Sequence, residues 1–311
     1  MSVIFEFDKN GLRRSEEPNG SKAVEPSCGN ADFERNQRRS LEECLQDLNG
    51  LVGMSEVKQT VESLVNLVRV RKARESAGYA PFAMSLHLVF TGNPGTGKTT
   101  VARLLSEIFR CIGVLSSGHL VEVDRSGLVG GYVGQTAIKV KEVVDRAKGG
   151  VLFIDEAYAL TVNRGDNDYG YEAVDTLLKA MEDYRQDLIV IVAGYSEPMA
   201  EFLGSNPGLR SRFNNFIEFP DYSADELYQI FIRMCQSNGL ALSDEAKGGA
   251  KKYFCSLYDG RGENFANARE VRNYLEKVMI NQANRIANSG APLEGDSLSQ
   301  IEEADIIFDG S

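Results

Sequence analysis

The sequence has few of the residues that bind metal ions or build disulfide frameworks. Its 311 residues include two histidines and five cysteines, and the cysteines are widely spaced without a C-x-x-C pair. An odd, scattered set of thiols argues against both metal ligation and a disulfide framework. His87 and His119 lie in apolar, strand-like runs, where we expect each imidazole to be held by structural hydrogen bonds.

Basic residues and long apolar runs are also scarce. The formal net charge is −11, which argues against a nucleic-acid partner because such binders neutralise phosphates with Lys and Arg. The longest apolar run, LIVIVAG from Leu188, is much too short to span a bilayer. The first ten residues lack the basic and apolar regions of a signal peptide. We therefore expect a cytoplasmic protein with no membrane contact.

What remains is the composition of an ordinary globular protein, with 42% hydrophobic and 25% charged residues. The length suits about two domains of roughly 150 residues. Residues 11–40 are polar and rich in Gly, Pro and Ser, so they bury too little apolar surface to offset the entropy of ordering. We expect a flexible N-terminal extension at 1–46, an α/β domain at 47–221, and a helical domain with an acidic tail at 222–311.

The α/β domain is predicted from apolar runs that alternate with helical patterns. Continuous apolar character fits strands of a parallel sheet that helices cover on both faces. The expected strands are 86–90, 119–123, 151–154 and 188–192, and the expected helices between them lie near 98–112, 136–148 and 170–184.

The strands stop after residue 222, and a small all-helical domain is expected there. Ser223 and Glu226 match a capping box that opens a helix. Two more helical segments follow, near 244–258 and 267–288.

A phosphate-binding loop follows the first expected strand. Residues 92–99, GNPGTGKT, match G-x-x-x-x-G-K-[ST]. The glycines let successive backbone N–H groups converge on phosphates at the positive end of the next helix. Lys98 would reach the β- and γ-phosphates of a nucleotide, and the Thr99 hydroxyl would ligate Mg²⁺. The other loop residues expected to bind the cofactor are Asn93, Pro94, Gly95, Thr96, Gly97 and Thr100.

An acidic pair follows the third expected strand. Asp155 and Glu156 would emerge at its carboxyl end, where open α/β sheets bind ligands. Asp155 would hold Mg²⁺ through water, and Glu156 would polarise the attacking water as a general base. One acidic pair after a strand is often only a helix cap, but the phosphate loop upstream favours the catalytic interpretation.

Two arginine sites follow these motifs. Arg210 and Arg212 come after a turn near the end of the α/β domain, where an arginine can reach the γ-phosphate of a neighbouring subunit. Arg269 opens the last expected helix and could fold onto the nucleotide. Each arginine by itself is typical of a surface charge. Their order along the chain, after the phosphate loop and the acidic pair, favours a role in nucleotide hydrolysis.

This order of motifs resembles that of the AAA+ ATPases. The runs LVFTGNPGTGKTTVA, GGVLFIDEAYAL, SNPGLRSRF and FANAREVRN resemble the CbbX and stage V sporulation protein K group, and the resemblance covers roughly residues 48–288. That group includes the red-type rubisco activase and the ATPase half of the secretion protein EccA. The resemblance implies a P-loop AAA+ module with a helical lid, ATP and Mg²⁺ as cofactors, and a homo-oligomer that forms a hexameric ring.

The resemblance also assigns roles to single residues. It makes Arg210 or Arg212 the finger that acts in trans, and Arg269 the sensor on the lid. Val52 and Gly53 lie where AAA+ proteins contact the adenine. Tyr195 departs from the general plan, which has a polar sensor, often Asn, near that place.

The glycine-rich stretch 129–137, which follows the second core strand, is expected to be a mobile loop and contains one aromatic residue. The resemblance implies that Tyr132, Val133 and Gly134 line the central pore of a ring and grip an extended polypeptide. The alternative is a tyrosine that packs on its own domain. A pore tyrosine would belong to a motor that remodels a protein substrate, and rubisco is one candidate substrate. The alternative function is an assembly switch that docks a partner without threading it. A DNA-processing ATPase is disfavoured by the charge.

Overall fold

The computed structural model describes residues 5–8, 11–14, 39–80, 85–132, 134–162, 168–289 and 298–306. The chain divides into two units, residues 1–35 and residues 36–311. In the first unit, β1 (Phe5–Asp8) and β2 (Gly11–Arg14) pair as an antiparallel hairpin. Residues 11–14, which we expected to belong to a linker, therefore form a strand.

The second unit is built on a five-stranded parallel sheet in the order β4-β5-β6-β3-β7. Four of its strands confirm the apolar runs: β3 (Leu88–Gly92), β4 (Leu120–Val123), β5 (Val151–Ile154) and β6 (Ile189–Gly194). The fifth, β7 (Asn215–Phe219), was not predicted. Its buried and exposed residues alternate because it lies at an edge of the sheet, so it lacks the continuous apolar run of a central strand.

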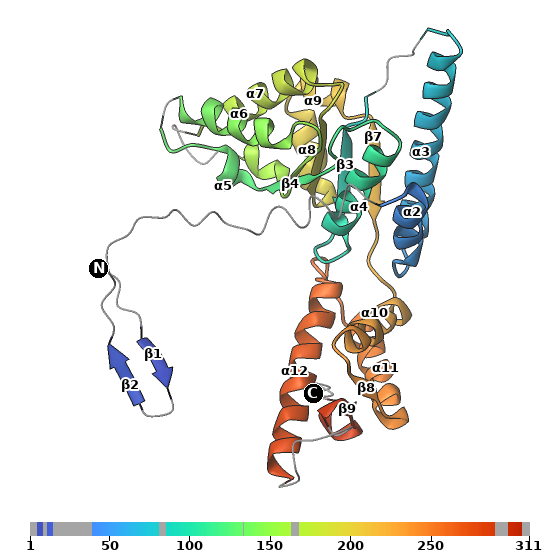
Figure 1. The fold of residues 1–311 in the computed structure, drawn as a ribbon, viewed down its shortest axis with the longest axis vertical. Helices are drawn as coiled ribbons and strands as arrows, with labels where there is room; N and C mark the ends of the chain where they lie inside the picture. Colours follow the sequence, from blue (N-terminus) through green and yellow to red (C-terminus); the bar gives the residue numbers. More distant parts are fainter. Residues whose placement is uncertain are drawn as a thin grey trace. The chain divides into compact units, whose positions relative to one another are not determined.

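Helices cover both faces of this sheet, as predicted (Figure 1). Alternate residues of β5 point to opposite faces, Phe153 into one hydrophobic core and Leu152 into the other. The helices on the Phe153 face are α2 (Leu41–Gly50), α3 (Ser55–Ser76) and α4 (Lys98–Cys111). Those on the Leu152 face are α6 (Gln135–Ala147), α7 (Gly170–Asp183), α8 (Ser196–Gly204) and the shorter α5 (Arg125–Leu128), η1 (Ala157–Leu160) and α9 (Pro207–Arg212).

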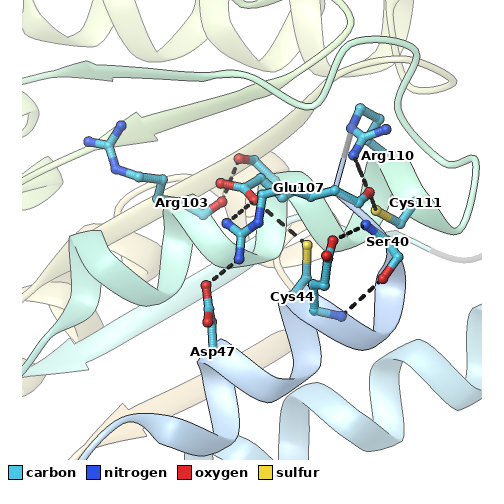
Figure 2. A network of polar contacts seen from close by, with 10 residues as sticks. Ser40, Cys44, Asp47, Arg103, Glu107, Arg110 and Cys111 are labelled. Carbon is cyan, nitrogen blue, oxygen red and sulfur yellow. Dashed lines mark hydrogen bonds and ion pairs between the residues drawn. The ribbon is translucent and has the colours of Figure 1, made fainter. Parts of the chain in front are cut away.

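The short helix α2 is docked on α4 by a polar network around a buried carboxylate (Figure 2). Glu107 on α4 accepts hydrogen bonds from Arg39, at 2.5 Å, and from the thiol of Cys44, at 3.6 Å. Arg39 also pairs with Asp47. Cys44 and Leu48 are buried against the α/β core. The boundary that we placed at residue 46 therefore falls inside a packed helix.

The C-terminal domain is helical, with a small addition. Its helices are α10 (Ala224–Ser237), α11 (Asp244–Asp259) and α12 (Ala268–Asn288). Ser223 and Glu226 form the predicted capping box. A two-residue parallel pair, β8 (Ala241–Leu242) with β9 (Gln300–Ile301), and the turn η3 (Glu303–Asp305) complete the domain, so it is not all-helical. Phe231 and Val271 extend the core of the Phe153 face into this lid.

Both histidines are structural, as expected. His87 is buried and its Nδ1 accepts from the backbone N–H of Val190 at 3.0 Å. Burial lowers the pKa of His87 to about 4, so the ring is neutral near pH 7. His119 contacts Ser117 Oγ and the carbonyl of Arg146. No cluster of His, Cys, Asp and Glu suited to a metal occurs in the described ranges, nor does a helix there have the length and apolar character to cross a bilayer.

Candidate nucleotide-binding site

The predicted phosphate loop joins β3 to α4 and is enclosed by two other segments. Its glycines adopt positive φ angles, 72° at Gly95 and 91° at Gly97, a conformation that glycine reaches without strain. A Cβ on Gly95 would lie 2.2 Å from the carbonyl oxygen of Ala266, and one on Gly97 would lie 2.4 Å from Met54 Cε. The loop therefore needs glycine for its turns and for its close packing, at Gly95 against the lid and at Gly97 against the residue before α3.

A cavity of about 570 Å³ opens beside this loop, between the sheet and the lid. Most of the residues predicted from the sequence line it together: Val52, Pro94, Gly95, Gly97, Lys98, Thr99, Thr100, Asp155, Glu156, Tyr195 and Arg269. They come from the loop before α3, the start of α4, the ends of β5 and β6, and the start of α12. The fold thus brings five separate segments to one site.

Three predicted nucleotide-binding residues do not line the cavity but shape its walls. Asn93 donates to the carboxylate of Asp221, and Thr96 donates from Oγ1 to the carbonyl of Asn93 at 2.8 Å. Gly53 has a φ of 61°, and a Cβ there would lie 2.1 Å from Glu226 Oε1. Asn93 and Thr96 thus hold the phosphate loop by hydrogen bonds, and Gly53 leaves room for the Glu226 carboxylate.

Lys98 is folded back onto the phosphate loop. Its Nζ donates to the carbonyls of Gly92 and Asn93, each at 2.8 Å. Burial lowers the pKa of Lys98 to about 8, although the nearby Asp155 carboxylate opposes the shift. An ammonium group held between two carbonyls at the wall of the cavity is well placed to exchange those partners for phosphate oxygens.

The acidic pair occupies the turn at the end of β5. The Asp155 backbone N–H donates to the carbonyl of Val123 at 2.9 Å, and its Oδ1 accepts from the Glu156 N–H at 3.1 Å. Glu156 has a φ of 49°, a left-handed conformation that costs a non-glycine residue of order 1–3 kcal/mol and is concentrated at functional sites. The Thr99 hydroxyl and the Asp155 carboxylate are oxygen donors of the kind that Mg²⁺ prefers.

Tyr195 follows β6 and reaches the same cavity. Its ring centroid lies 6.3 Å from that of Tyr158, which follows the acidic pair, with the planes inclined by 53°. This tilted contact places the Tyr195 side chain beside the turn that carries Glu156. Tyr195 therefore lines the cavity beside the acidic pair, and its role as the sensor stays a prediction.

The cavity is also lined by residues of α10 and of the loop before α3 that the sequence reasoning missed. Leu51 and Met54 from the loop before α3 face Ile230, Met234 and Ser237 of α10. The spacing of these α10 residues, at i, i+4 and i+7, places them on one face of the helix, and that pattern could have identified them. Lys58 Nζ anchors the loop by donating to the carbonyl of Leu51 at 2.6 Å.

The two candidate finger arginines differ sharply in their surroundings. Arg212 is partly buried, and its Nη2 lies 3.7 Å from Glu182 Oε2 on α7. Arg210 is exposed, and it has no ion pair or side-chain hydrogen bond among the described residues. Neither arginine lines the cavity of its own chain. Arg212 is therefore packed against its own domain, whereas the guanidinium of Arg210 is free to contact another molecule.

Tyr132 points into solvent from the loop before α6. Its residue exposure is 74%, so the ring does not pack on its own domain. Gly134 has a φ of 79° and precedes the first residue of α6. Val133, the middle residue of the predicted pore motif, lies outside the described residues.

A strand, a phosphate loop and a helix, with an acidic pair on a second strand of the sheet and a helical lid, define a P-loop nucleotide-binding module. Residues 88–221 match the family described as ATPase family associated with various cellular activities (AAA), and residues 223–311 match the AAA lid domain. The fold also aligns with a chain solved in a study of katanin self-assembly, with a TM-score of 0.55 and 19% identity over 92% of this chain and 90% of that one.

Curated relatives are considerably more similar in sequence. The chain is 46% identical to Protein CbbX of Cereibacter sphaeroides over 85% of both chains. It is 43% identical to stage V sporulation protein K of Bacillus subtilis (strain 168), over 86% of this chain and 82% of the relative. It is 43% identical to the chloroplastic ribulose bisphosphate carboxylase/oxygenase activase of Cyanidioschyzon merolae, over 87% and 92%. The chain belongs to the AAA ATPase family, in the group of CbbX and stage V sporulation protein K.

Proposed function

We propose that the protein hydrolyses ATP to ADP and phosphate with Mg²⁺ at the cavity between the sheet and the lid. The observation that carries this proposal is that Lys98, Glu156 and Arg269, from three separate segments, line one cavity. Lys98 would bind the β- and γ-phosphates, and Glu156 would accept a proton from the attacking water. Thr99 and Asp155 would hold Mg²⁺, which when bound neutralises charge on the phosphates. Arg269 would contact the γ-phosphate from the lid.

The exposed Arg210 supports a site that is completed by a second copy of the chain. It does not reach its own cavity and has no partner of its own among the described residues, whereas Arg212 is engaged with Glu182. We assign Arg210 as the finger that enters the site of the neighbouring protomer, a contribution worth about 10³–10⁵ in rate in other nucleotide hydrolases. Such head-to-tail contacts close into a ring, for which we propose six protomers.

The exposed Tyr132 supports a motor that pulls on a polypeptide. In a ring, a loop that follows β4 would present this aromatic side chain to the central opening, where it would grip an extended chain by apolar contact. One relative is named as a ribulose bisphosphate carboxylase/oxygenase activase, so inhibited rubisco is the substrate that we propose to test first.

The experiment compares three variants with the wild type. Glu156→Gln should bind ATP and hydrolyse almost none. Tyr132→Ala should keep its basal ATP turnover and lose the recovery of inhibited rubisco from the same organism. Tyr132→Phe, which keeps the ring, should retain both activities.

The outcomes separate the parts of the proposal. Wild-type turnover in Glu156→Gln would remove that residue from catalysis. Full rubisco recovery by Tyr132→Ala would favour an assembly switch without threading. If the wild type hydrolyses ATP but leaves rubisco inhibited, the substrate assignment is wrong and the ATPase assignment stands.

A further inference from the structure

A buried asparagine connects the phosphate loop to the lid. Asn267 is completely buried. Its Oδ1 accepts from the backbone N–H of Tyr222 at 2.9 Å. Its Nδ2 donates to Asp221 Oδ1 at 2.7 Å, to the carbonyl of Phe265 at 3.0 Å and, at 3.4 Å, to the carbonyl of Pro94 in the phosphate loop. One amide therefore joins the segment that leads into α10 to the segment that leads into α12.

The same carboxylate reaches the phosphate loop. Asp221 accepts from Asn93 Nδ2 at 3.0 and 3.2 Å, and the carbonyl of Asn93 accepts from Lys98 Nζ at 2.8 Å. We call this chain of contacts, from Lys98 through Asn93 and Asp221 to Asn267, the relay. A backbone hydrogen bond from the Ala268 N–H to the carbonyl of Gly95, at 3.2 Å, connects the same two segments. The loop that would hold the phosphates and the first turn of α12 are thus in direct contact.

The backbone of Asn267 is strained, and the hydrogen bonds of its side chain offset the cost of that strain. Its φ and ψ are 50° and −122°, a region favoured by glycine and costly for other residues, by of order 1–3 kcal/mol. Glycine at this position would relieve the strain. Asparagine instead supplies the hydrogen bonds of its amide, so the chain accepts a strained backbone where the relay needs a side chain.

We propose that Asn267 and Asp221 are positioning residues that set the register of α12 against the phosphate loop and thereby place Arg269 for the γ-phosphate. Arg269 lies two residues beyond Asn267 and lines the cavity with Lys98 and Glu156. Movement of Lys98 from the Asn93 carbonyl to a bound phosphate changes one end of the relay, and the relay carries that change to the lid. This inference rests on the proposed ATP hydrolysis and adds the pair that aligns its sensor arginine.

The test is a double-mutant cycle of Asn267→Gly with Arg269→Ala, using steady-state ATP turnover and the Kd values of ATP and ADP. Binding is measured in a Glu156→Gln background to prevent hydrolysis. Asn267→Gly keeps a backbone that suits the site and removes only the amide. We expect kcat to fall about 10- to 100-fold, since small misplacements of a positioned group cost this much. ATP affinity should fall more than ADP affinity, because ADP has no γ-phosphate.

The decisive quantity is the non-additivity of the two changes. If Asn267 acts through Arg269, adding Asn267→Gly to Arg269→Ala should lower kcat less than about twofold further, as for residues that act as a unit. Full additivity, or equal losses of ATP and ADP affinity, would overturn the proposal by showing a purely structural role. Failure of the wild type itself to hydrolyse ATP would instead refute the proposed function.

Two further variants guard against general destabilisation. Asn288→Gly removes an exposed asparagine at the far end of α12 and should leave kcat unchanged. Asn267→Asp would face the Asp221 carboxylate and lose activity. Adding Asp221→Asn should recover part of it, because the new amide can accept from Asn93 and donate to the carboxylate introduced at position 267. If the double variant regains the wild-type Tm but no ATP turnover, the proposed relay is wrong.

Discussion

At the residue scale, the site depends on charges held in unfavourable surroundings. Lys98 is held among backbone carbonyls, and its burial depresses its pKa to about 8. The cost of that burial remains until a more negative partner arrives. A triphosphate supplies such a partner. We therefore expect part of the affinity for nucleotide to come from relieving a buried ammonium whose hydrogen bonds go to two backbone carbonyls.

The depressed pKa predicts how ATP binding changes with pH. Bound phosphate favours the charged ammonium and so raises the pKa of Lys98 in the complex. Above about pH 8 the free protein has lost the proton that the complex retains, so binding takes up a proton and affinity falls, at most about tenfold per pH unit. We expect the ATP Kd of Glu156→Gln to be nearly constant from about pH 7 to 8 and to rise between about pH 8 and 9.5.

A guanidinium at the same position is the control. Arg stays protonated throughout this range, so Lys98→Arg in the same background should bind ATP more weakly with a flatter pH profile. An equally steep profile in both proteins would assign the titration to another group.

At the element scale, the packing of α2 on α4 supports the helix that begins at Lys98. The buried Glu107 receives Arg39 and the Cys44 thiol from the α2 side (Figure 2). Burial raises the pKa of Cys44 to about 12, so this sulfur is a neutral thiol and acts as a donor to the carboxylate. The ion pair with Arg39 is therefore the main compensation for the Glu107 charge.

Removal of Arg39 should therefore destabilise the domain. Arg39→Ala leaves a buried carboxylate without its cation, and we expect the free energy of unfolding to fall by about 1–2 kcal/mol, less than for a fully buried pair because Arg39 is partly exposed to water. The double variant Arg39→Ala with Glu107→Gln should lose less free energy of unfolding than Arg39→Ala alone. Urea denaturation of the three proteins measures both effects. A double variant less stable than Arg39→Ala would contradict this account.

At the scale of the whole molecule, we expect the proposed reaction to need a second protomer. The cavity of a single chain contains Lys98, Glu156 and Arg269 but neither Arg210 nor Arg212. A finger from a neighbour would complete the site, and Tyr132 would act only where several copies surround one opening. Hydrolysis and substrate remodelling are therefore proposed as properties of the assembly.

A mixing experiment tests this dependence. Arg210→Ala subunits added to wild type at constant total concentration should depress ATP turnover more than dilution predicts, because each altered subunit disables the site of its neighbour. Arg212→Ala should instead lower the Tm slightly, because the contacts with Glu182 and with the carbonyl of Gly208 are partly exposed to water, and its effect on mixed rings should follow dilution. Linear loss of activity with Arg210→Ala would show that the sites act independently.

The features that could be predicted from the sequence are those that depend on a few consecutive residues. The phosphate loop, the acidic pair and the four apolar strands each follow from a short stretch of consecutive residues, and the capping box of α10 follows from Ser223 and Glu226. Strand β7 was missed because an edge strand alternates like many surface segments. The first part of helix α2, residues 41–46, was assigned to the flexible extension because the residue that Cys44 contacts, Glu107, lies far along the chain.

The sequence by itself determined the chemistry of this protein: which residues could bind phosphate, hold a magnesium ion and polarise water, since motif spacing and local backbone preference are properties of neighbouring residues. Only the tertiary structure decided which arginine is available, that Tyr132 is exposed, and that Asn93, Asp221 and Asn267 form one relay. Those outcomes depend on burial and on contacts between residues 46 to 128 positions apart, and no local pattern encodes them.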